Sequence, residues 1–521
     1  MKVLSLMLIF LTVSGYSYVL QPRLTVAQVA ELDRDQSDMT SEQLGDVSIS
    51  VEEEEKAAEL TEEGKTGGLT PETNSERRMA ADDETSQKSD QMDQLKQEKV
   101  EEESESRLVA GIGLHKEARR EMITVNQQNV EEKGGNGGIE AHMDNYCPPE
   151  CACYGRVVQC SDKGVDKVPY GIPYNSRYIL LMNNHINVIQ LDLLNEYVSM
   201  EFLVLSNNRL KDETIEGAFE GIPALKRLYL NKNLLISVPA DLPMSLEELR
   251  LDNNHLSVMS EAAWARCPGL LILSLSNNSL GNGSAFLRNA VLSPLSSLRT
   301  LNLDHNQLTS VPLDLPLSIK QLYLKGNLIE QFRGGAFNGR SELMVLDLSS
   351  NRLTNKGLLK DSLLNATHLE SLNLEGNRLK QVPQHLPSSL KTLNLEGNLI
   401  CSIKKMVFGT LKNLEHLGLA RNKIFKVAPG AFKTLPVLHQ LDLCHNTLRQ
   451  VPRQIPKALH SLALTHNKIQ TVPRDAFCWG NQSYSLSGLV RVQLEHNLID
   501  MGKLDAQAFR CLRGFQVVHF Y

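Results

Sequence analysis

Residues 298–308 read LRTLNLDHNQL, and residues 369–379 read LESLNLEGNRL. Both follow the pattern L-x-x-L-x-L-x-x-N-x-L. The central x-L-x-L-x part alternates apolar and variable residues with a period of two, which is the pattern of a short β-strand with one buried face. The asparagine stands where the chain leaves that strand. We therefore expect its amide to bond backbone groups that the turn leaves unpaired.

The same pattern recurs along the chain from about residue 176. Its asparagine stands at Asn184, Asn208, Asn233, Asn254, Asn278, Asn306, Asn327, Asn351, Asn377, Asn398, Asn422, Asn446, Asn467 and Asn497. A period of 20 to 30 residues with this pattern is the signature of leucine-rich repeats. One repeat cannot bury its leucines alone, so the repeats must stack. The sequence predicts a solenoid with a curved parallel sheet, a horseshoe whose strands line the concave side.

The distance between successive asparagines indicates the structure of the convex side. Every third step is 21 residues, and the others are 24 to 30. Each short repeat carries V-P-x-x-[L/I]-P, as at Val238-Pro239 and Leu242-Pro243. Two prolines favour extended backbone. We therefore predict a mostly extended convex side with few helices.

The residues before the repeats predict export and disorder. Val3–Val13 is an apolar run after Lys2, with small residues following, which is typical of a signal peptide at residues 1–17. The alternative, a membrane anchor, needs a longer apolar run. Residues 18–146 hold 31 acidic against 14 basic residues. The part at 18–140 is too polar to bury a core and is predicted to be a disordered acidic segment.

The nine cysteines all lie after residue 146. Four of them stand at Cys147, Cys151, Cys153 and Cys160, which predicts a cap over the first repeat at 147–175. Cys478 and Cys511 lie in a second predicted cap at 478–521, after repeats at 176–477. In an exported protein clustered cysteines pair as disulfides. A zinc site is the alternative, but no paired C-x-x-C is present.

The segment CPPECACYGRVVQCSD at residues 147–162 resembles the N-terminal cap of the decorin and biglycan class of small leucine-rich-repeat proteins. The short-long-long rhythm and the long repeat before the last cysteine are similar too. This resemblance implies the pairs Cys147–Cys153, Cys151–Cys160 and Cys478–Cys511. It also implies a secreted protein of the extracellular matrix that binds collagen and heparin-like glycosaminoglycans and supports matrix organisation and cell adhesion. The chain has no Arg-Gly-Asp tripeptide, and residues 18–146 have no Ser-Gly pair for glycosaminoglycan attachment. We therefore expect a glycoprotein without that route to integrins.

Two charged surfaces are candidates for binding. The concave side is predicted to be apolar at first, from Tyr178 to Val204, as an interface or as packing against the cap. It is then basic through Lys226, Arg227, Arg250, Arg299, Lys320 and Lys325, and acidic from Asp347 to Glu415. Alternating charge of this kind suits a collagen rod. A second basic set follows the strands and is expected to line one edge, where a polyanion would bind: Arg378, Lys380, Lys404, Lys405, Lys423, Lys426, Arg449 and Lys468. Ordinary solubilising charge is the alternative for both sets.

Several single residues have open interpretations. His445, His466 and His496 share one repeat position, which allows a metal or pH-sensing column but also plain exposure. Cys267, Cys401 and Cys444 are too far apart to pair within one solenoid. Cys267 is expected to be buried, whereas Cys444 could crosslink two chains. Glycosylation sequons stand at Asn277, Asn282, Asn365 and Asn481.

No catalytic motif accompanies these features. The sequence has no nucleophile elbow, no phosphate-binding glycine loop and no H-E-x-x-H. We predict a non-enzymatic binder with no cofactor, no metal, no nucleic-acid partner and no membrane insertion. A cell-surface receptor is a further candidate partner, and a dimer is possible. The alternative function is a soluble binder of a protein ligand or cell-surface receptor.

Overall fold

A computed structural model describes residues 146–521 except 258, 260, 282–289, 333–340, 359–361, 364–365 and 479–485. The predicted signal peptide at 1–17 and the predicted acidic segment at 18–140 lie outside the described residues. Within the described part, no helix has both the length and the apolar character that crossing a bilayer requires.

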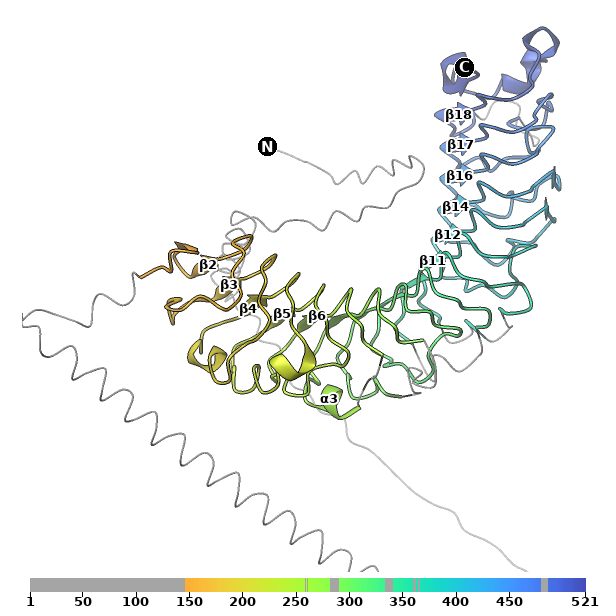
Figure 1. Cartoon of the computed structure of the whole chain (residues 1–521). Helices are drawn as coiled ribbons and strands as arrows, with labels where there is room; N and C mark the ends of the chain where they lie inside the picture. The colour runs from red at the N-terminus through yellow and green to blue at the C-terminus, as the bar shows by residue number, and fades with distance from the viewer. Residues whose placement is uncertain are drawn as a thin grey trace, which may run out of the picture. The chain divides into compact units, whose positions relative to one another are not determined.

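One sheet of 17 short strands runs through the described residues. Its strands stack side by side along a curve, with β2 near one end and β18 near the other (Figure 1). All neighbours in this sheet are parallel except β1 and β2 at its start, which pair antiparallel. The predicted leucine-rich-repeat solenoid, with a curved parallel sheet on its concave side, is confirmed.

The strands are short because each repeat contributes only its x-L-x core. Fourteen strands come from the fourteen repeats: β3 (Tyr178–Leu180), β4 (Phe202–Val204), β5 (Arg227–Tyr229), β6 (Glu248–Arg250), β7 (Ile272–Ser274), β8 (Thr300–Asn302), β9 (Gln321–Tyr323), β10 (Val345–Asp347), β11 (Ser371–Asn373), β12 (Thr392–Asn394), β14 (His416–Gly418), β16 (Gln440–Asp442), β17 (Ser461–Ala463) and β18 (Arg491–Gln493). The remaining three belong to the ends of the sheet: β1 (Ala152–Tyr154), β2 (Val157–Gln159) and β19 (Val518–His519).

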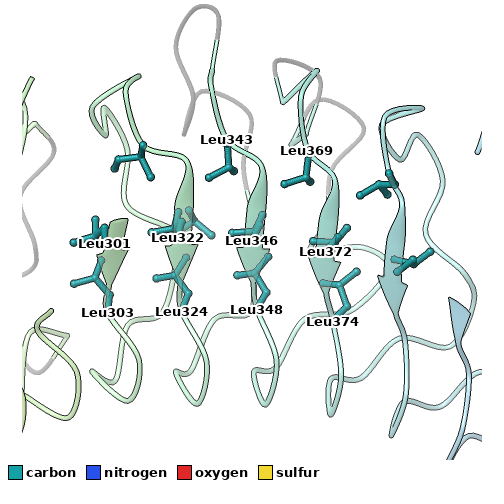
Figure 2. Packing of buried hydrophobic residues seen from close by; sticks show 14 of the residues in the cluster. Leu301, Leu303, Leu322, Leu324, Leu343, Leu346, Leu348, Leu369, Leu372 and Leu374 are labelled. Carbon is teal, nitrogen blue, oxygen red and sulfur yellow. The ribbon is translucent and has the colours of Figure 1, made fainter. Parts of the chain in front are cut away.

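Leucine stacks upon leucine in the core. The register pairs Leu301 with Leu322, Leu322 with Leu346, and Leu346 with Leu372, so equal positions of the repeat meet (Figure 2). These side chains are 0–1% exposed. Each buried leucine contributes on the order of 2 kcal/mol of hydrophobic stabilisation. That contribution is available only when both neighbouring repeats are in place.

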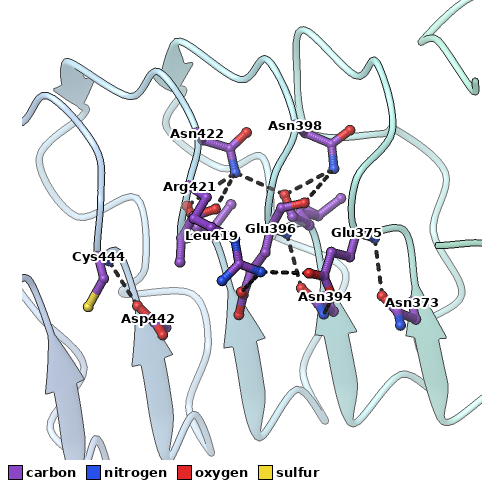
Figure 3. Close-up of polar contacts among 12 residues, drawn as sticks. Asn373, Glu375, Asn394, Glu396, Asn398, Leu419, Arg421, Asn422, Asp442 and Cys444 are labelled. Atoms are coloured by element: carbon purple, nitrogen blue, oxygen red, sulfur yellow. Dashed lines mark hydrogen bonds and ion pairs between the residues drawn. The ribbon is translucent and has the colours of Figure 1, made fainter. Parts of the chain in front are cut away.

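The repeat asparagine bonds the backbone of two repeats at once, as its position in the pattern predicted. The Asn398 side chain donates from Nδ2 to the carbonyl oxygens of Leu374 (2.8 Å), Leu395 (3.1 Å) and Glu396 (3.1 Å) (Figure 3). Its Oδ1 accepts from the Leu379 backbone N–H at 3.0 Å. The other repeats repeat this arrangement with small variations. The buried polar groups of each turn are thereby satisfied.

The residue before each repeat asparagine has a left-handed backbone. All fourteen have positive φ, from 52° at Asn277 to 68° at Gly326. Asparagine, histidine and glycine tolerate this conformation better than most residues. The requirement accounts for Gly376 and Gly397, and for the three histidines at this position in the last repeats.

The convex side is mostly extended, as predicted. The described residues contain one α-helix, α3 (Glu261–Ala265), and the 3-10 helices η2 (Leu194–Glu196), η3 (Asp212–Thr214), η4 (Met501–Lys503), η5 (Ala506–Phe509) and η6 (Phe515–Val517). A second, two-stranded parallel sheet lies after the repeat asparagines, formed by β13 (Ser402–Ile403) and β15 (Lys426–Val427).

Disulfides stand at both ends of the solenoid. The structure pairs Cys147 with Cys153 and Cys151 with Cys160, and these bonds close the β1–β2 hairpin of the cap, whereas the pairing of β2 with β3 joins the cap to the first repeat. At the other end Cys478 pairs with Cys511. These are the pairs that the resemblance implied. β19 then adds to β18 as the last strand.

Candidate functional site: concave face and basic edge

Aromatic and aliphatic side chains gather where the concave face begins. Tyr178, Leu180, Phe202 and Val204 form a buried cluster with Val157 of β2, and Met182 and Tyr229 pack against it. The Phe202 ring meets the rings of Tyr178 and Tyr229 edge-on, with centroids 6.3 and 4.8 Å apart, a favourable geometry for aromatic pairs. Since Val157 belongs to the N-terminal cap, packing against the cap accounts for part of this cluster.

The two arginines expected on β5 and β6 share one carboxylate. Glu248 is only 8% exposed. Its Oε1 lies 2.7 Å from Arg250 Nε, and its Oε2 lies 3.7 Å from Arg227 Nε. The Arg250 guanidinium also stands 4.8 Å from the Tyr229 ring centroid. This network holds both arginines in place on the concave face. Two arginines and one glutamate together carry one net positive charge.

Tyr229 completes that network. Its hydroxyl donates to Glu248 Oε1 at 2.9 Å. Burial, with the neighbouring Glu248 charge as the next cause, raises the pKa of Tyr229 to about 12. The phenol therefore stays protonated at every physiological pH and remains a hydrogen-bond donor.

The other predicted concave cations are spread along the sheet. Lys226, Arg299 and Lys320 stand just before their strands, and each backbone N–H donates to a carbonyl of the preceding repeat. Lys320 Nζ lies 3.7 Å from Glu342. Lys325 follows β9, and its backbone N–H donates to Asp304 at 2.7 Å. The structure brings Arg227 and Arg250 together, but it does not gather all six cations at one point.

The acidic half of the concave face contains a cation that the sequence reading missed. Arg421 Nη2 lies 2.6 Å from Glu375 and 3.0 Å from Glu396 (Figure 3). Its repeat position matches Lys232 in the third repeat, which is the signal that could have found it. Burial, then the Asp442 charge, raises the pKa of Glu396, whereas Arg421 lowers it. Glu370 is paired in a similar way with Lys391, at 2.9 Å.

The second basic set lies on the surface after the strands. All eight of its members are exposed: Arg378, Lys380, Lys404, Lys405, Lys423, Lys426, Arg449 and Lys468. Three of them join their repeat to the one before it through a backbone hydrogen bond. The N–H groups of Arg378, Lys423 and Lys468 donate to the carbonyl oxygens of Leu353, Ile400 and Leu448. None of the eight has a carboxylate partner within the described residues. We call this set the basic edge.

A cleft of about 270 Å³ opens on the basic edge. Its lining includes two of the eight cations, Lys426 and Arg449, with the exposed ring of Phe425 and the side chains of Gln450 and Gln470. The sequence reading identified the cations but not the ring or the amides. Phe425 is 59% exposed, and the available signal in the sequence was an aromatic residue between Lys423 and Lys426, just after a repeat asparagine.

The three histidines stack as a column. The rings of His445 and His466 are 4.2 Å apart, and those of His466 and His496 are 4.3 Å apart. Burial, followed by the charges of the two neighbouring histidines, lowers the pKa of His466. No group of three or more His, Cys, Asp or Glu side chains in the described residues is placed to hold a metal ion.

The three cysteines outside the disulfides differ in exposure. Cys267 is buried, as expected, and burial raises the pKa of its thiol to about 11. Cys401 is exposed, whereas Cys444 is half-buried. Burial, then Asp442, raises the pKa of the Cys444 thiol to about 12. The more accessible thiol is therefore Cys401, and not Cys444, where the sequence suggested a crosslink.

One of the four sequons can be placed. Asn277 is exposed, and its Nδ2 donates to Asn253 Oδ1 at 2.7 Å. Asn282, Asn365 and Asn481 lie outside the described residues.

Known protein families match two parts of this architecture. A leucine-rich-repeat model matches residues 244–309, 318–386 and 388–455, and a leucine-rich-repeat N-terminal domain model matches residues 146–173. Keratocan of Danio rerio is 34% identical over 241 residues, which cover 46% of this chain and 68% of keratocan. Podocan-like protein 1 of Homo sapiens is 30% identical over 379 residues, 72% of each chain. This chain belongs to the small leucine-rich proteoglycan family.

Further relatives fit this membership. Podocan of Mus musculus is 34% identical over 371 residues, 70% of this chain, and the match spans 59% of podocan's length. These relatives are small leucine-rich proteoglycans of the extracellular matrix. Family membership and the solenoid fold are typical of non-enzymatic binding scaffolds.

Solved structures share the fold. A leucine-rich-repeat protein of Leptospira interrogans has a TM-score of 0.52 at 24% identity, covering 71% of this chain and 96% of its own. A chain in the octameric complex of Latrophilin 3, Unc5D and FLRT2 has a TM-score of 0.51 at 23% identity, covering 70% and 100%. At this identity the likeness concerns the fold alone.

Proposed function

We propose that this chain is a secreted extracellular matrix glycoprotein that binds heparin-like glycosaminoglycans and collagen, and thereby supports matrix organisation and cell adhesion. The basic edge carries the glycosaminoglycan part. Its eight cations are exposed and have no carboxylate partners within the described residues. They stand just after the repeat asparagines, where backbone hydrogen bonds join successive repeats. A linear polyanion meets such charges in series, so its affinity comes from many weak contacts.

The concave face supports the collagen part. It carries the arginines of β5 and β6 in its first half, and Glu375 and Glu396 with their single bridging Arg421 in its second half. A rod with alternating charges is complementary to such a face, and the fixed side chains lose little freedom on binding. Attached glycans are proposed at Asn277, Asn282, Asn365 and Asn481.

The test is a binding series with the full chain. Retention on immobilised heparin should fall steeply as salt rises, because the charges are exposed. Co-sedimentation with collagen fibrils should persist at moderate salt. If neither heparin nor collagen retains the chain at low salt, the proposal is wrong.

A receptor-type protein ligand is the second candidate function. The partly exposed margin of the aromatic cluster, formed by Met182 and Tyr229, favours it, because methionine and tyrosine are enriched in protein interfaces. In one solved structure with this fold, the leucine-rich-repeat chain is part of a complex with Latrophilin 3 and Unc5D. Binding to cell-surface ectodomains that survives removal of heparin and collagen would favour this candidate, and a Met182→Ala variant should then weaken it.

A further inference from the structure

Where a short repeat follows a long one, a side-chain oxygen of the long repeat accepts hydrogen bonds from backbone N–H groups of the short repeat. In the second repeat this acceptor is Asp212. Its carboxylate accepts from the backbone N–H groups of Ile236 (2.9 Å) and Ser237 (3.0 Å), and from the Ser237 hydroxyl at 2.8 Å. The carboxylate thus holds two N–H groups that point out of the short repeat.

The eighth repeat uses an amide at the same place. Asn355 Oδ1 accepts from the backbone N–H groups of Lys380 (2.8 Å) and Gln381 (3.1 Å). Asp212 and Asn355 each stand four residues after the repeat asparagine, and each bonds the third and fourth residues after the next repeat asparagine. The two short repeats therefore depend on one equivalent oxygen acceptor.

The eleventh repeat has Lys426 at this position. An ammonium group has three donors and no acceptor, so it cannot replace the carboxylate or the amide. The N–H groups that correspond to those of Ile236 and Ser237 are those of Arg449 and Gln450. Neither has a hydrogen-bond acceptor within the described residues.

The strand pairing on this surface is interrupted at the same point. Lys426 and Val427 of β15 pair back to Ser402 and Ile403 of β13. Gln450 pairs forward with Thr471. No bond joins these two pairs within the described residues, and the cleft on the basic edge opens between them. The cleft therefore lies at the same residues, Lys426, Arg449 and Gln450, where the acceptor is missing.

The cleft has the chemistry of an anion site. Arg449 and Gln450, whose backbone N–H groups have no acceptor within the described residues, line the cleft together with Lys426, at the repeat position where a carboxylate accepts two N–H groups in the second repeat. Backbone N–H groups in a concave surface bind anions, and arginine and lysine add charge-assisted bonds. The exposed face of Phe425 and the amides of Gln450 and Gln470 offer an apolar platform and hydrogen bonds beside the anion position.

We propose that this cleft binds one sulfate or carboxylate group of a sulfated polysaccharide, which takes the place that the Asp212 carboxylate has in the second repeat. This inference rests on the glycosaminoglycan binding proposed above and assigns it a specific subsite. A polysaccharide fits better than an acidic peptide for two reasons. A sugar ring can lie on Phe425 with its hydroxyls at the glutamines, and Lys404, Lys405, Lys423 and Lys468 continue the same edge for further sulfates.

The test compares two neutral substitutions at one residue in the full chain. Lys426→Asn supplies an acceptor of the kind that Asn355 provides, whereas Lys426→Met removes the charge without supplying one. Lys404→Met is the control for charge on the same edge. The ligand is a heparin hexasaccharide, with inorganic sulfate and a poly-glutamate peptide as separate arms.

The expected order of hexasaccharide affinity is wild type, then Lys404→Met, then Lys426→Met, then Lys426→Asn. We expect Lys426→Asn to be at least threefold weaker than Lys426→Met, because its amide competes for the two N–H groups. Amide hydrogen exchange at Arg449 and Gln450 should slow when the hexasaccharide binds to the wild type, and should already be slow in free Lys426→Asn. Lys426→Asn should melt no lower than Lys426→Met.

The failures are distinguishable. Hexasaccharide binding with equal affinities for the two Lys426 variants and no slowing at Arg449 and Gln450 would overturn the subsite and leave the proposed function intact. A wild type that binds no hexasaccharide would overturn both. Equal slowing with poly-glutamate would overturn the choice of a polysaccharide, and slowing with inorganic sulfate alone would show a site for the free anion only.

Discussion

Arg421 reaches back across two repeats to Glu375, which lies 46 positions earlier in the chain, and their charged atoms are 2.6 Å apart. The same guanidinium contacts Glu396 at 3.0 Å. One side chain thus connects the ninth, tenth and eleventh repeats across the concave face (Figure 3). Because repeats otherwise contact only their neighbours, this clamp is a longer-range tie within the solenoid.

Replacing Arg421 tests the clamp. Asparagine is the suitable neutral residue, because φ is 53° at this position and Asn183 and Asn207 occupy it in other repeats. We expect Arg421→Asn to lower the free energy of unfolding by about 0.5–1 kcal/mol at pH 7, since the group is partly exposed and screened. The loss should shrink in high salt, and also at pH 4, because the raised pKa of Glu396 favours the neutral form of that carboxyl as pH falls. Urea unfolding measures it, with Arg421→Lys as the control. An equal loss at both pH values would show that charge is not the cause.

The buried asparagine column should be far more sensitive. Asn398→Ala removes the acceptor of the Leu379 N–H and the donor to three carbonyls, all in a site that is only 3% exposed. Leaving such groups unsatisfied costs about 2–4 kcal/mol. Asn413→Ala is the control, because Asn413 is exposed and makes one backbone bond, at 3.1 Å. Thermal unfolding should show a large fall for the first variant and a small one for the second, and similar falls would contradict the role of the column.

Asp304 should make stability depend on pH in an unusual direction. Burial raises the pKa of its carboxyl to about 6, partly offset by the bond from the Lys325 N–H. The folded state then holds a proton that the unfolded state loses near pH 4, so this stabilising contribution is present below pH 4 and is lost as pH rises through 6. Asp304→Asn should be more stable than wild type by on the order of 2 kcal/mol at pH 7.5. At pH 4 the two should be nearly equal. A constant difference over pH 4–7.5 would rule out this pKa.

The free thiols should react in the order of their exposure. Cys401 is exposed, whereas burial raises the pKa of Cys444 to about 12 and that of Cys267 to about 11. Since the thiolate is the reactive form, maleimide at pH 7.5 should label Cys401 in the folded chain well before the other two. Mass spectrometry of the peptides measures this. Any disulfide-linked dimer should disappear in Cys401→Ser and persist in Cys444→Ser, and the reverse result would restore the crosslink expected from the sequence.

Substitutions in the basic edge should weaken heparin binding more than substitutions of the concave cations. Lys423→Ala combined with Lys468→Ala removes two charges of the edge that have no carboxylate partner in the described part of the chain. The salt concentration that elutes the chain from heparin should therefore fall clearly. Arg227→Ala combined with Lys320→Ala removes two concave cations that already have carboxylate partners, so its elution should change little. A larger effect of the concave pair would place the polyanion on the other face.

The sheet was predictable because its information is local. The leucines, the turn asparagine and the length of each repeat can be read from that repeat alone. Stacking then requires only that leucines at the same repeat position lie side by side, as Leu301, Leu322 and Leu346 do. The extended convex side followed in the same way from the prolines of the short repeats. The caps were predictable in position from the cysteines, and in pairing only through the family resemblance.

The sites were less predictable because they depend on which side chains meet across repeats. Arg227 and Arg250 were expected among the cations of the concave face, but the sequence pattern did not show that both contact Glu248. The cleft at Lys426 depends on a missing acceptor. That absence has meaning only once Asp212 and Asn355 are seen to bond the equivalent N–H groups.

The two short terminal strands have a consequence for the protein at high concentration. A parallel sheet of identical repeats offers an open edge at each end, where another chain could add its own strand and start a fibre. Here the last strand at one end is three residues long, folded back as a hairpin and held by two disulfides, and at the other end β19 has two residues. Both templates for end-to-end growth are thereby blunted, so a fold built by repetition stops at a finite molecule.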